Sequence, residues 1–249
     1  MDDREEILRK VRQLILLYKS GKLGGSIMPE DSNPGFAKGS KENYTYFTLP
    51  IALNYQRNSY KLWEAAVATL SDPETADVFD ITSVACMSEQ LLQEKLTQYK
   101  LALQRNKQPA IWKTLCCTFH ERYSDDIRNL FEEQGRSVKS IKEYMSSNKK
   151  QFPYLSGNKI MNYWLYVVEN YTDMVFVDRR EITVAPDTHI IQSSEKLGVI
   201  SSEEKASSKV QEMVSHAWEI ILSGTEICPI DIHTPLWLWS RSGFAEKVG

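Results

Sequence analysis

Apolar residues recur along most of the chain at the spacing of amphipathic helices. The first helix is expected to end at Ser20-Gly21, and a loop rich in Gly, Pro, Ser and Asp follows over residues 20–42. Further helical patterns follow this loop, so the sequence predicts a succession of short helices. The first helix has apolar residues at positions 7, 8, 11, 14, 15 and 18. The helical patterns after the loop are FTLPIALNYQ, KLWEAAVATL, MSEQLLQEKLTQYKLALQ and IWKTLCCTFHERY.

Several helix starts and ends carry recognisable capping residues. Ser124-Asp125-Asp126 is typical of the cap of a short helix. Ser201 and Glu204 fit a capping box, which predicts a long helix through Ile221 that Gly224 ends. Only residues 173–185 show β-branched alternation, and a single such stretch cannot form a sheet. We therefore expect an all-α protein.

Composition is that of an ordinary globular protein. Of 249 residues, 42% are hydrophobic and 25% charged, which is enough apolar mass for a sizeable core and excludes disorder as the main state. No apolar run approaches the roughly 18 residues of a membrane span, and the N-terminus is charged where a signal peptide would be apolar. The expected location is therefore intracellular, in the cytoplasm or nucleoid, without a membrane partner.

Cysteine and histidine spacing predicts no metal centre. The cysteines form neither a CxxC pair nor the run that holds an iron–sulfur cluster, so we interpret all four as buried small apolar residues. The histidines are too scattered along the sequence to specify a zinc site. The residues concerned are Cys86, Cys116, Cys117 and Cys228, with His120, His189, His216 and His233.

Positive charge is concentrated in one segment. A net charge of −3 argues, taken alone, against a nucleic-acid binder, because neutralisation of phosphates supplies most of the affinity of such proteins. Residues 136–159, however, carry six basic side chains and one acid, a local charge of +5. Composition alone favours a solvated helix face here, and the residues that follow strengthen the case for phosphate binding.

Residues 152–168 predict a helical hairpin. The turn Ser156-Gly157-Asn158 lies between a basic amphipathic helix and an apolar one, and its glycine is expected to take a positive φ and to allow close backbone approach. Amides at the start of the second helix, with Lys149 and Lys150 beside them, suit a nucleic-acid phosphate. The alternative is an ordinary pair of helices in which the glycine only caps the first.

Lys159 begins the apolar helix directly after the turn. Its side chain should be partly desolvated and close to the positive end of the helix dipole, and both effects favour the neutral amine that a Schiff-base nucleophile needs. The alternative is a lysine that extends from a helix end into solvent.

Asp187 opens a later helix. It follows Pro186 and precedes an apolar-periodic segment, so its simplest interpretation is an N-cap. An N-cap role and a catalytic role are compatible, because a carboxylate fixed at a helix N-terminus can also stabilise a cationic sugar or accept a proton from an amine.

These residues together resemble a known enzyme family. A glycine hairpin followed at once by Lys159, and some 28 positions later Asp187 in Pro-Asp-x-His-apolar, is similar to the helix-hairpin-helix (HhH-GPD) DNA glycosylases. The stretch PIDIHTPLWLWSR resembles the archaeal 8-oxoguanine (GO) glycosylase branch, AGOG, and the likeness covers roughly residues 45–245.

The resemblance implies an all-α fold of two helical subdomains with the active-site cleft between them. It leads us to expect one catalytic unit, residues 1–249, with a helical bundle at 45–135 and the helix-hairpin-helix subdomain at 136–200. Residues 1–44 and 201–249 are then expected to pack across both.

The resemblance also assigns roles to individual residues. Lys159 matches the nucleophile that attacks the sugar C1′, and Asp187 matches the aspartate that assists it. Trp63 and Trp237 match aromatic residues of the base pocket, although core packing is an equal alternative for either. The hairpin residues match a phosphate-gripping turn, and His189 is expected to contact sugar or phosphate unless it only caps its helix. The expected phosphate-binding set is Ser156, Gly157, Asn158, Lys149, Lys150 and His189.

Two departures from the AGOG pattern bear on the substrate. The pattern has an acid four residues before Trp237, where this sequence has His233, with Asp231 two residues earlier. His233 and Asp231 are both assigned to the base pocket. Because a histidine can donate as well as accept hydrogen bonds, the substrate could be 8-oxoguanine or another modified base. The base-reading residue expected near the N-terminus has no match in residues 20–42.

The resemblance therefore implies a base-excision-repair DNA glycosylase with AP (abasic-site) lyase activity. It would remove an oxidised purine similar to 8-oxoguanine through a lysine Schiff base and β-elimination. No metal or organic cofactor is expected, and the partner is double-stranded DNA with a damaged base, bound by a monomer without an obligate protein partner. Two alternatives stay open: a monofunctional glycosylase in which Asp187 activates water, and a non-enzymatic helix-hairpin-helix DNA-binding module.

Overall fold

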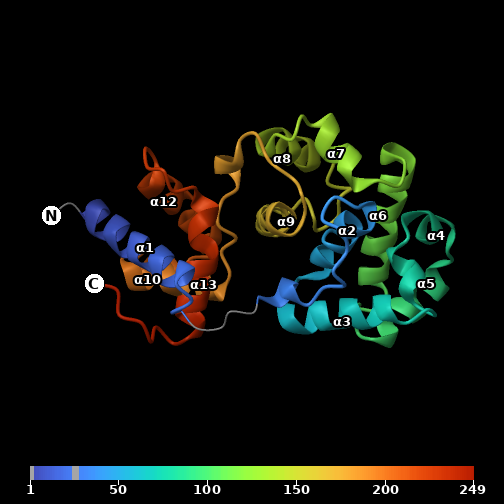
Figure 1. Ribbon diagram of the computed structural model, residues 1–249, viewed down its shortest axis with the longest axis horizontal. Helices are drawn as coiled ribbons and strands as arrows, with labels where there is room; N and C mark the ends of the chain where they lie inside the picture. Colours follow the sequence, from blue (N-terminus) through green and yellow to red (C-terminus); the bar gives the residue numbers. More distant parts are fainter. Residues whose placement is uncertain (1–2, 24–27) are drawn as a thin grey trace. The chain divides into compact units, whose positions relative to one another are not determined.

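The computed structural model describes residues 3–23 and 28–249, and this part of the chain is built from helices (Figure 1). It contains thirteen α-helices and no β-strand, which confirms the all-α class. None of the described helices is both long and apolar enough to cross a membrane. Residues 24–27, part of the loop in which a base-reading residue was sought, lie outside the described residues.

The chain forms two compact units. The smaller unit comprises the described residues 3–23 with 179–249, and the larger comprises residues 28–178. The smaller contains α1 (Asp3–Lys19), η4 (Arg179–Glu181), α10 (Thr188–Leu197), α11 (Ser202–Lys205), α12 (Val210–Leu222), η5 (Pro229–Ile232) and α13 (His233–Arg241). The larger contains η1 (Pro29–Asp31), α2 (Lys41–Tyr46), η2 (Pro50–Leu53), α3 (Ser59–Ser71), η3 (Ala76–Phe79), α4 (Ile81–Cys86), α5 (Glu89–Gln98), α6 (Lys107–Tyr123), α7 (Ile127–Glu133), α8 (Val138–Ser147) and α9 (Asn158–Tyr171).

This division differs from the expected subdomain boundaries. The boundary placed between residues 135 and 136 falls inside the larger unit, because helices on both sides of it share one core. The Phe131 ring of α7 lies 5.1 Å from the Trp164 ring of α9, measured between centroids, and 5.9 Å from the ring of Phe176. Helical periodicity shows that a segment is amphipathic but not which core it joins.

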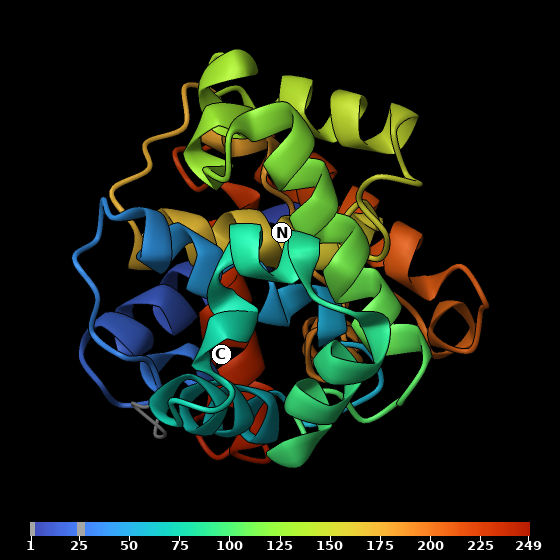
Figure 2. The same ribbon diagram turned by 90° about the vertical axis from the view of Figure 1, so that its right-hand side faces the viewer.

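Buried tryptophans organise the core of the larger unit. Trp63, Trp112 and Trp164 are fully buried. The indole of Trp112 donates to the carbonyl of Val78 (2.8 Å), and that of Trp164 donates to the hydroxyl of Thr48 (2.9 Å). Because a buried N–H without a partner is costly, these bonds let large apolar rings fill the core without that penalty. Figure 2 shows α5 and α6 of this unit side by side.

Helices α10 and α13 form the centre of the smaller unit. The Ser193 hydroxyl of α10 donates to the Leu236 carbonyl of α13 at 2.7 Å. Arg4 of α1 donates to the carbonyls of Ile221 (3.2 Å) and Ser223 (2.6 Å), and so satisfies backbone groups at the end of α12. These bonds join the N-terminal helix to the C-terminal helices of the same unit.

Two local predictions need correction. The capping box of Ser201 and Glu204 forms, but it opens only the short α11, and the long helix α12 begins at Val210. The Ser207 hydroxyl accepts from the Lys209 N–H between them, which gives the backbone an alternative to a continuous helix. The cysteine prediction is wrong for Cys86, which is exposed, and holds fully for the buried Cys116; Cys117 and Cys228 are half-buried.

The alternating segment 173–185 forms no strand, and a turn at residues 177–178 and the 3-10 helix η4 (Arg179–Glu181) interrupt it. Met174 and Phe176 are buried whereas Val175 and Val177 are exposed, so burial alternates over residues 174–177, but residues 182–185 are all buried. The described residues contain no β-strand, which confirms the prediction that this single stretch forms no sheet.

Candidate functional site

The hairpin between α8 and α9 differs in detail from the expected tight turn. Gly157 has φ −74° and is the N-cap residue of α9, so the predicted positive φ is wrong. The left-handed conformation belongs instead to Tyr154, with φ +61°. Glycine is still favoured at 157, because a Cβ there would lie 3.2 Å from the Tyr154 carbonyl oxygen. This contact, and not a positive φ, favours glycine at 157, and the close approach of a phosphate to its backbone stays a prediction.

A depression lies at this hairpin, with a volume of about 480 Å³. It contains four of the six residues that sequence reasoning assigned to phosphate binding, and no acidic residue lines it. Lys150 is exposed but does not line the depression, and His189 belongs to the smaller unit. The lining residues are Lys142, Ser146, Lys149, Tyr154, Ser156, Gly157, Asn158 and Met161.

The depression is suited to an anion. Lys142 and Lys149 supply two positive charges. No side chain caps the first turn of α9, so the N–H groups of Asn158, Lys159 and Ile160 have no capping side chain and no partner within the helix. Together with the helix dipole these groups favour a phosphate oxygen at this position.

Lys159 is the second residue of α9 and is half-buried beside Ile160 and Met161, both buried. Among residues 28–178 its ammonium has no hydrogen-bond or ion-pair partner. An amine that is partly desolvated and unpaired keeps its lone pair accessible once deprotonated, which a nucleophile requires.

Asp187 caps α10, as the simpler interpretation predicted. One carboxylate oxygen, Oδ1, accepts from the N–H groups of His189 (2.9 Å) and Ile190 (3.0 Å). The other, Oδ2, accepts from the indole Nε1 of Trp237 at 3.1 Å. Three donors thus hold the carboxylate of Asp187 in one orientation.

His189 and Trp237 gather around this carboxylate. Their ring centroids lie 5.4 Å apart in an edge-to-face arrangement, and His189 Nδ1 lies 3.1 Å from the Ser240 hydroxyl. The guanidinium carbon of Arg241 lies 4.9 Å from the Trp237 ring centroid. Three residues singled out from the sequence therefore form one cluster in the smaller unit, on α10 and α13.

Asp231 and His233, the other two residues assigned to the base pocket, form polar contacts within the smaller unit. Asp231 accepts from the Cys228 N–H (2.9 Å) and pairs with Arg179 (2.7 Å). His233 is buried at the start of α13, and its Nδ1 accepts from the Ala185 N–H at 3.5 Å. Their contacts with a base stay a prediction.

Trp63 is fully buried in the larger unit, with its ring against Tyr46 and Phe47. This placement favours the core-packing alternative for Trp63. Its indole donates to the hydroxyl of Tyr163 (3.2 Å), and that hydroxyl in turn donates to Oε1 of Glu30. Among the described residues, Oε2 of Glu30 is buried and has no hydrogen-bond partner.

Sequence reasoning missed Glu30 and Tyr163. Burial raises the pKa of Glu30 to about 7, and burial also raises the pKa of Tyr163. No sequence signal marks an acid in a Gly/Pro-rich loop as buried, because only the tertiary fold places Glu30 beside α9.

The Glu30 carboxyl should make stability depend on pH. Its pKa is 4.5 when unfolded and about 7 when folded, so only the folded state holds the proton between these values. Stability therefore falls by about 1.4 kcal/mol per pH unit across that window, roughly 3 kcal/mol in all, and levels off above pH 7. Urea unfolding of wild type and Glu30→Gln at several pH values should show this slope in wild type alone. Parallel pH profiles of the two proteins would contradict the assignment.

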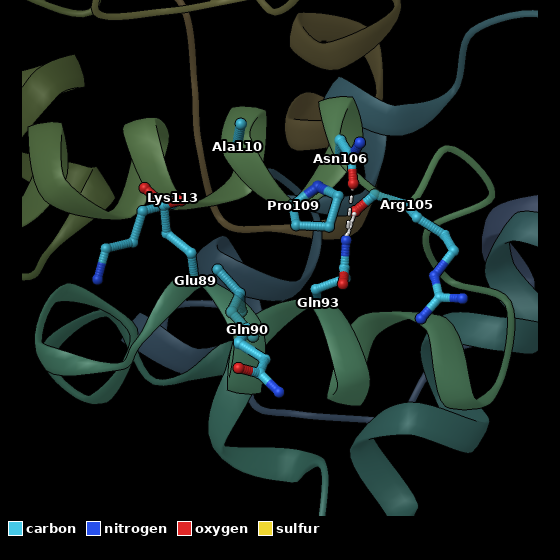
Figure 3. A pocket seen from close by; sticks show the side chains of 9 residues that line it. Glu89, Gln90, Gln93, Arg105, Asn106, Pro109, Ala110 and Lys113 are labelled. Atoms are coloured by element: carbon cyan, nitrogen blue, oxygen red, sulfur yellow. Dashed lines mark hydrogen bonds between the residues drawn. The ribbon is translucent and has the colours of Figure 1, made fainter.

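A second depression lies between α5 and α6 (Figure 3). The Gln93 amide that faces it donates to the Arg105 carbonyl (2.7 Å) and to Asn106 Oδ1 (2.9 Å). Lys113 donates to the carbonyls of Val84 (2.6 Å) and Met87 (2.7 Å) near the end of α4. Because these polar groups join helices to one another, we assign this depression no functional role.

No protein-family model matches the chain, and a search of curated proteins finds no significant match. Within residues 3–23 and 28–249, no three His, Cys, Asp or Glu side chains gather as potential metal ligands. The chemistry of the site is therefore inferred from its own residues.

Proposed function

We propose that the protein is a DNA glycosylase with AP lyase activity, of the helix-hairpin-helix type. Its substrate would be double-stranded DNA that contains an oxidised purine similar to 8-oxoguanine. One observation carries the proposal: the amine of Lys159, which has no partner among residues 28–178, follows immediately after hairpin residues that line a cationic depression without acidic residues. A phosphate held there would bring the sugar-phosphate backbone close to the amine.

Lys159 would act as the nucleophile. Its neutral amine forms a bond to the sugar C1′ while the bond from C1′ to the base breaks, and the base departs with that electron pair and takes up a proton. Opening of the sugar ring gives an imine between Lys159 and C1′. Loss of a proton from C2′ then expels the 3′ phosphate and cleaves the strand.

The resemblance to the glycosylase family assigns Asp187 the stabilisation of the positive charge that develops on the sugar, and we propose that role for its carboxylate. The donors from His189, Ile190 and Trp237 keep its carboxylate oriented before the substrate binds. Trp237 is half-buried and presents an aromatic face on which an extruded base could stack.

The burial of Trp63 favours a second candidate function, a DNA-binding module without catalysis. In such a module the hairpin depression would hold phosphate while the base pocket stayed filled with protein side chains. The two functions differ in one observable, because only an imine can be reduced by borohydride to a stable protein–DNA cross-link.

One panel of substrates tests the proposal. The protein is incubated with duplexes that contain 8-oxoguanine, uracil, an alkylated purine or an abasic site, with and without borohydride. The proposed enzyme releases the oxidised purine, cleaves that strand and gives a cross-link. A DNA-binding module binds these duplexes without any of the three products.

The depression predicts a specific salt dependence of DNA binding. Replacing Lys149 by glutamine removes one phosphate contact, so the slope of log K against log salt should fall in magnitude by about 0.9. Fluorescence anisotropy at several salt concentrations measures this slope on an undamaged duplex. Lys61→Gln serves as a control, since Lys61 pairs with Glu64 at 2.7 Å and lies outside the depression. Equal slopes for wild type and Lys149→Gln would exclude the contact.

A further inference from the structure

Two tyrosines form an aromatic pair at the edge of the hairpin depression. The ring centroids of Tyr55 and Tyr154 lie 5.3 Å apart at an interplanar angle of 65°. Tyr55 is 41% exposed and Tyr154 is half-buried, so aromatic surface of the pair reaches solvent. Exposed aromatic side chains that pack on each other rather than in a core are available to stack on a ligand.

The backbone of Tyr154 is held in an unfavourable conformation. Its φ of +61° lies in the left-handed region, which costs a non-glycine residue energy. The Tyr154 carbonyl accepts from the Gly157 N–H at 3.0 Å, and this bond ties the strained residue to the start of α9. The turn therefore holds the Tyr154 ring next to the first residues of that helix.

A cation accompanies the aromatic pair. The Lys107 ammonium lies 4.9 Å from the Tyr154 ring centroid and 5.9 Å from that of Tyr55. Lys107 is exposed, so its ammonium carries a positive charge at neutral pH. Lys107 adds to the positive charges of Lys142 and Lys149 in the depression that Tyr154 also lines.

We propose that Tyr55 and Tyr154 form a stacking site for one unpaired nucleobase of the DNA strand whose phosphate occupies the depression. The inference rests on the proposed function and names the state of the DNA that the larger unit recognises. An aromatic surface beside an acid-free cluster of lysines matches a nucleotide, which joins an aromatic base to a phosphate. In an intact duplex the faces of a base are covered by its neighbours, so only an unpaired base can use the site.

The test compares two duplexes of equal length, one fully paired and one with a single unpaired thymine. Binding is measured by fluorescence anisotropy for wild type, Tyr55→Leu, Tyr154→Asn and Tyr154→Phe. Asparagine tolerates the left-handed backbone at 154, and phenylalanine retains the ring. Tyr99→Leu is the matched control, because Tyr99 is 38% exposed and its hydroxyl donates to Asp72 (2.8 Å), away from the lysine cluster.

Loss of either ring should weaken binding to the unpaired-base duplex roughly tenfold, with little effect on the fully paired one. Tyr154→Phe and Tyr99→Leu should bind both duplexes like wild type. A 5-iodouracil placed at the unpaired position should cross-link on irradiation to Tyr55 or Tyr154, as peptide mass spectrometry would show.

Two other results would overturn the inference. Equal affinities of wild type and both ring-loss variants for the unpaired-base duplex, with cross-links on other residues, would exclude the stacking site. If wild type still forms the borohydride cross-link, that result leaves the proposed function intact. Failure of wild type to bind either duplex would instead exclude the proposed function and the stacking site together.

Discussion

Replacing Lys159 by glutamine is expected to abolish the borohydride-trapped adduct and strand cleavage on duplexes that contain 8-oxoguanine. Glutamine has no nucleophilic amine, so neither the bond to C1′ nor the imine can form. The rate of product formation should fall by about 10³-fold or more, while affinity for the duplex changes little. Single-turnover kinetics and anisotropy on the same DNA measure the two quantities.

Lys150→Gln is the matched control for this variant. Lys150 is exposed, belongs to the same basic segment and loses the same charge, but does not line the hairpin depression. It should retain the trapped adduct. If Lys159→Gln trapped as much DNA as wild type, Lys159 would not be the nucleophile. If the two variants lost activity equally, charge at the hairpin and not the amine would explain the loss.

Replacing Asp187 by asparagine should lower the rate of base excision by about 10² to 10⁴-fold with a small change in stability. Asparagine is as good an N-cap as aspartate, so its side-chain oxygen can still accept from the N–H groups of His189 and Ile190. It cannot carry the negative charge that is proposed to stabilise a cationic sugar.

Asp187→Ala separates the structural role from the chemical one. Alanine removes the cap of α10 as well as the carboxylate, and loss of an N-cap costs about 1 kcal/mol. We expect both variants to lose excision and only the alanine variant to lose this stability in urea unfolding. An asparagine variant with wild-type excision rates would restrict Asp187 to capping α10.

Residues whose role depends on local sequence were predicted well. The cap of α7 at Asp126 and the cap of α10 at Asp187 follow from side chains within a few positions of each helix terminus. Such signals are local, because a cap accepts hydrogen bonds from its own first turn. The all-α class followed from the same periodicity.

Features that depend on distant contacts were predicted less well. Nothing near Trp63 in the sequence shows that Tyr46 and Phe47 cover its ring, and nothing near Glu30 shows that Tyr163 donates to it. Gly157 illustrates the same limit, since a close carbonyl rather than a positive φ favours glycine there. The contact between Asp187 and Trp237 joins residues 50 positions apart, and only the resemblance to a family suggested a common site.

The most direct measurement identifies the amine that becomes attached to DNA. Wild-type protein is incubated with a duplex that contains 8-oxoguanine, reduced with borohydride, digested and analysed by peptide mass spectrometry. A reduced sugar adduct on Lys159, absent from an undamaged duplex of the same sequence, is the predicted result. An adduct on a different amine, or none at all on damaged DNA that the protein binds, would contradict the lyase assignment.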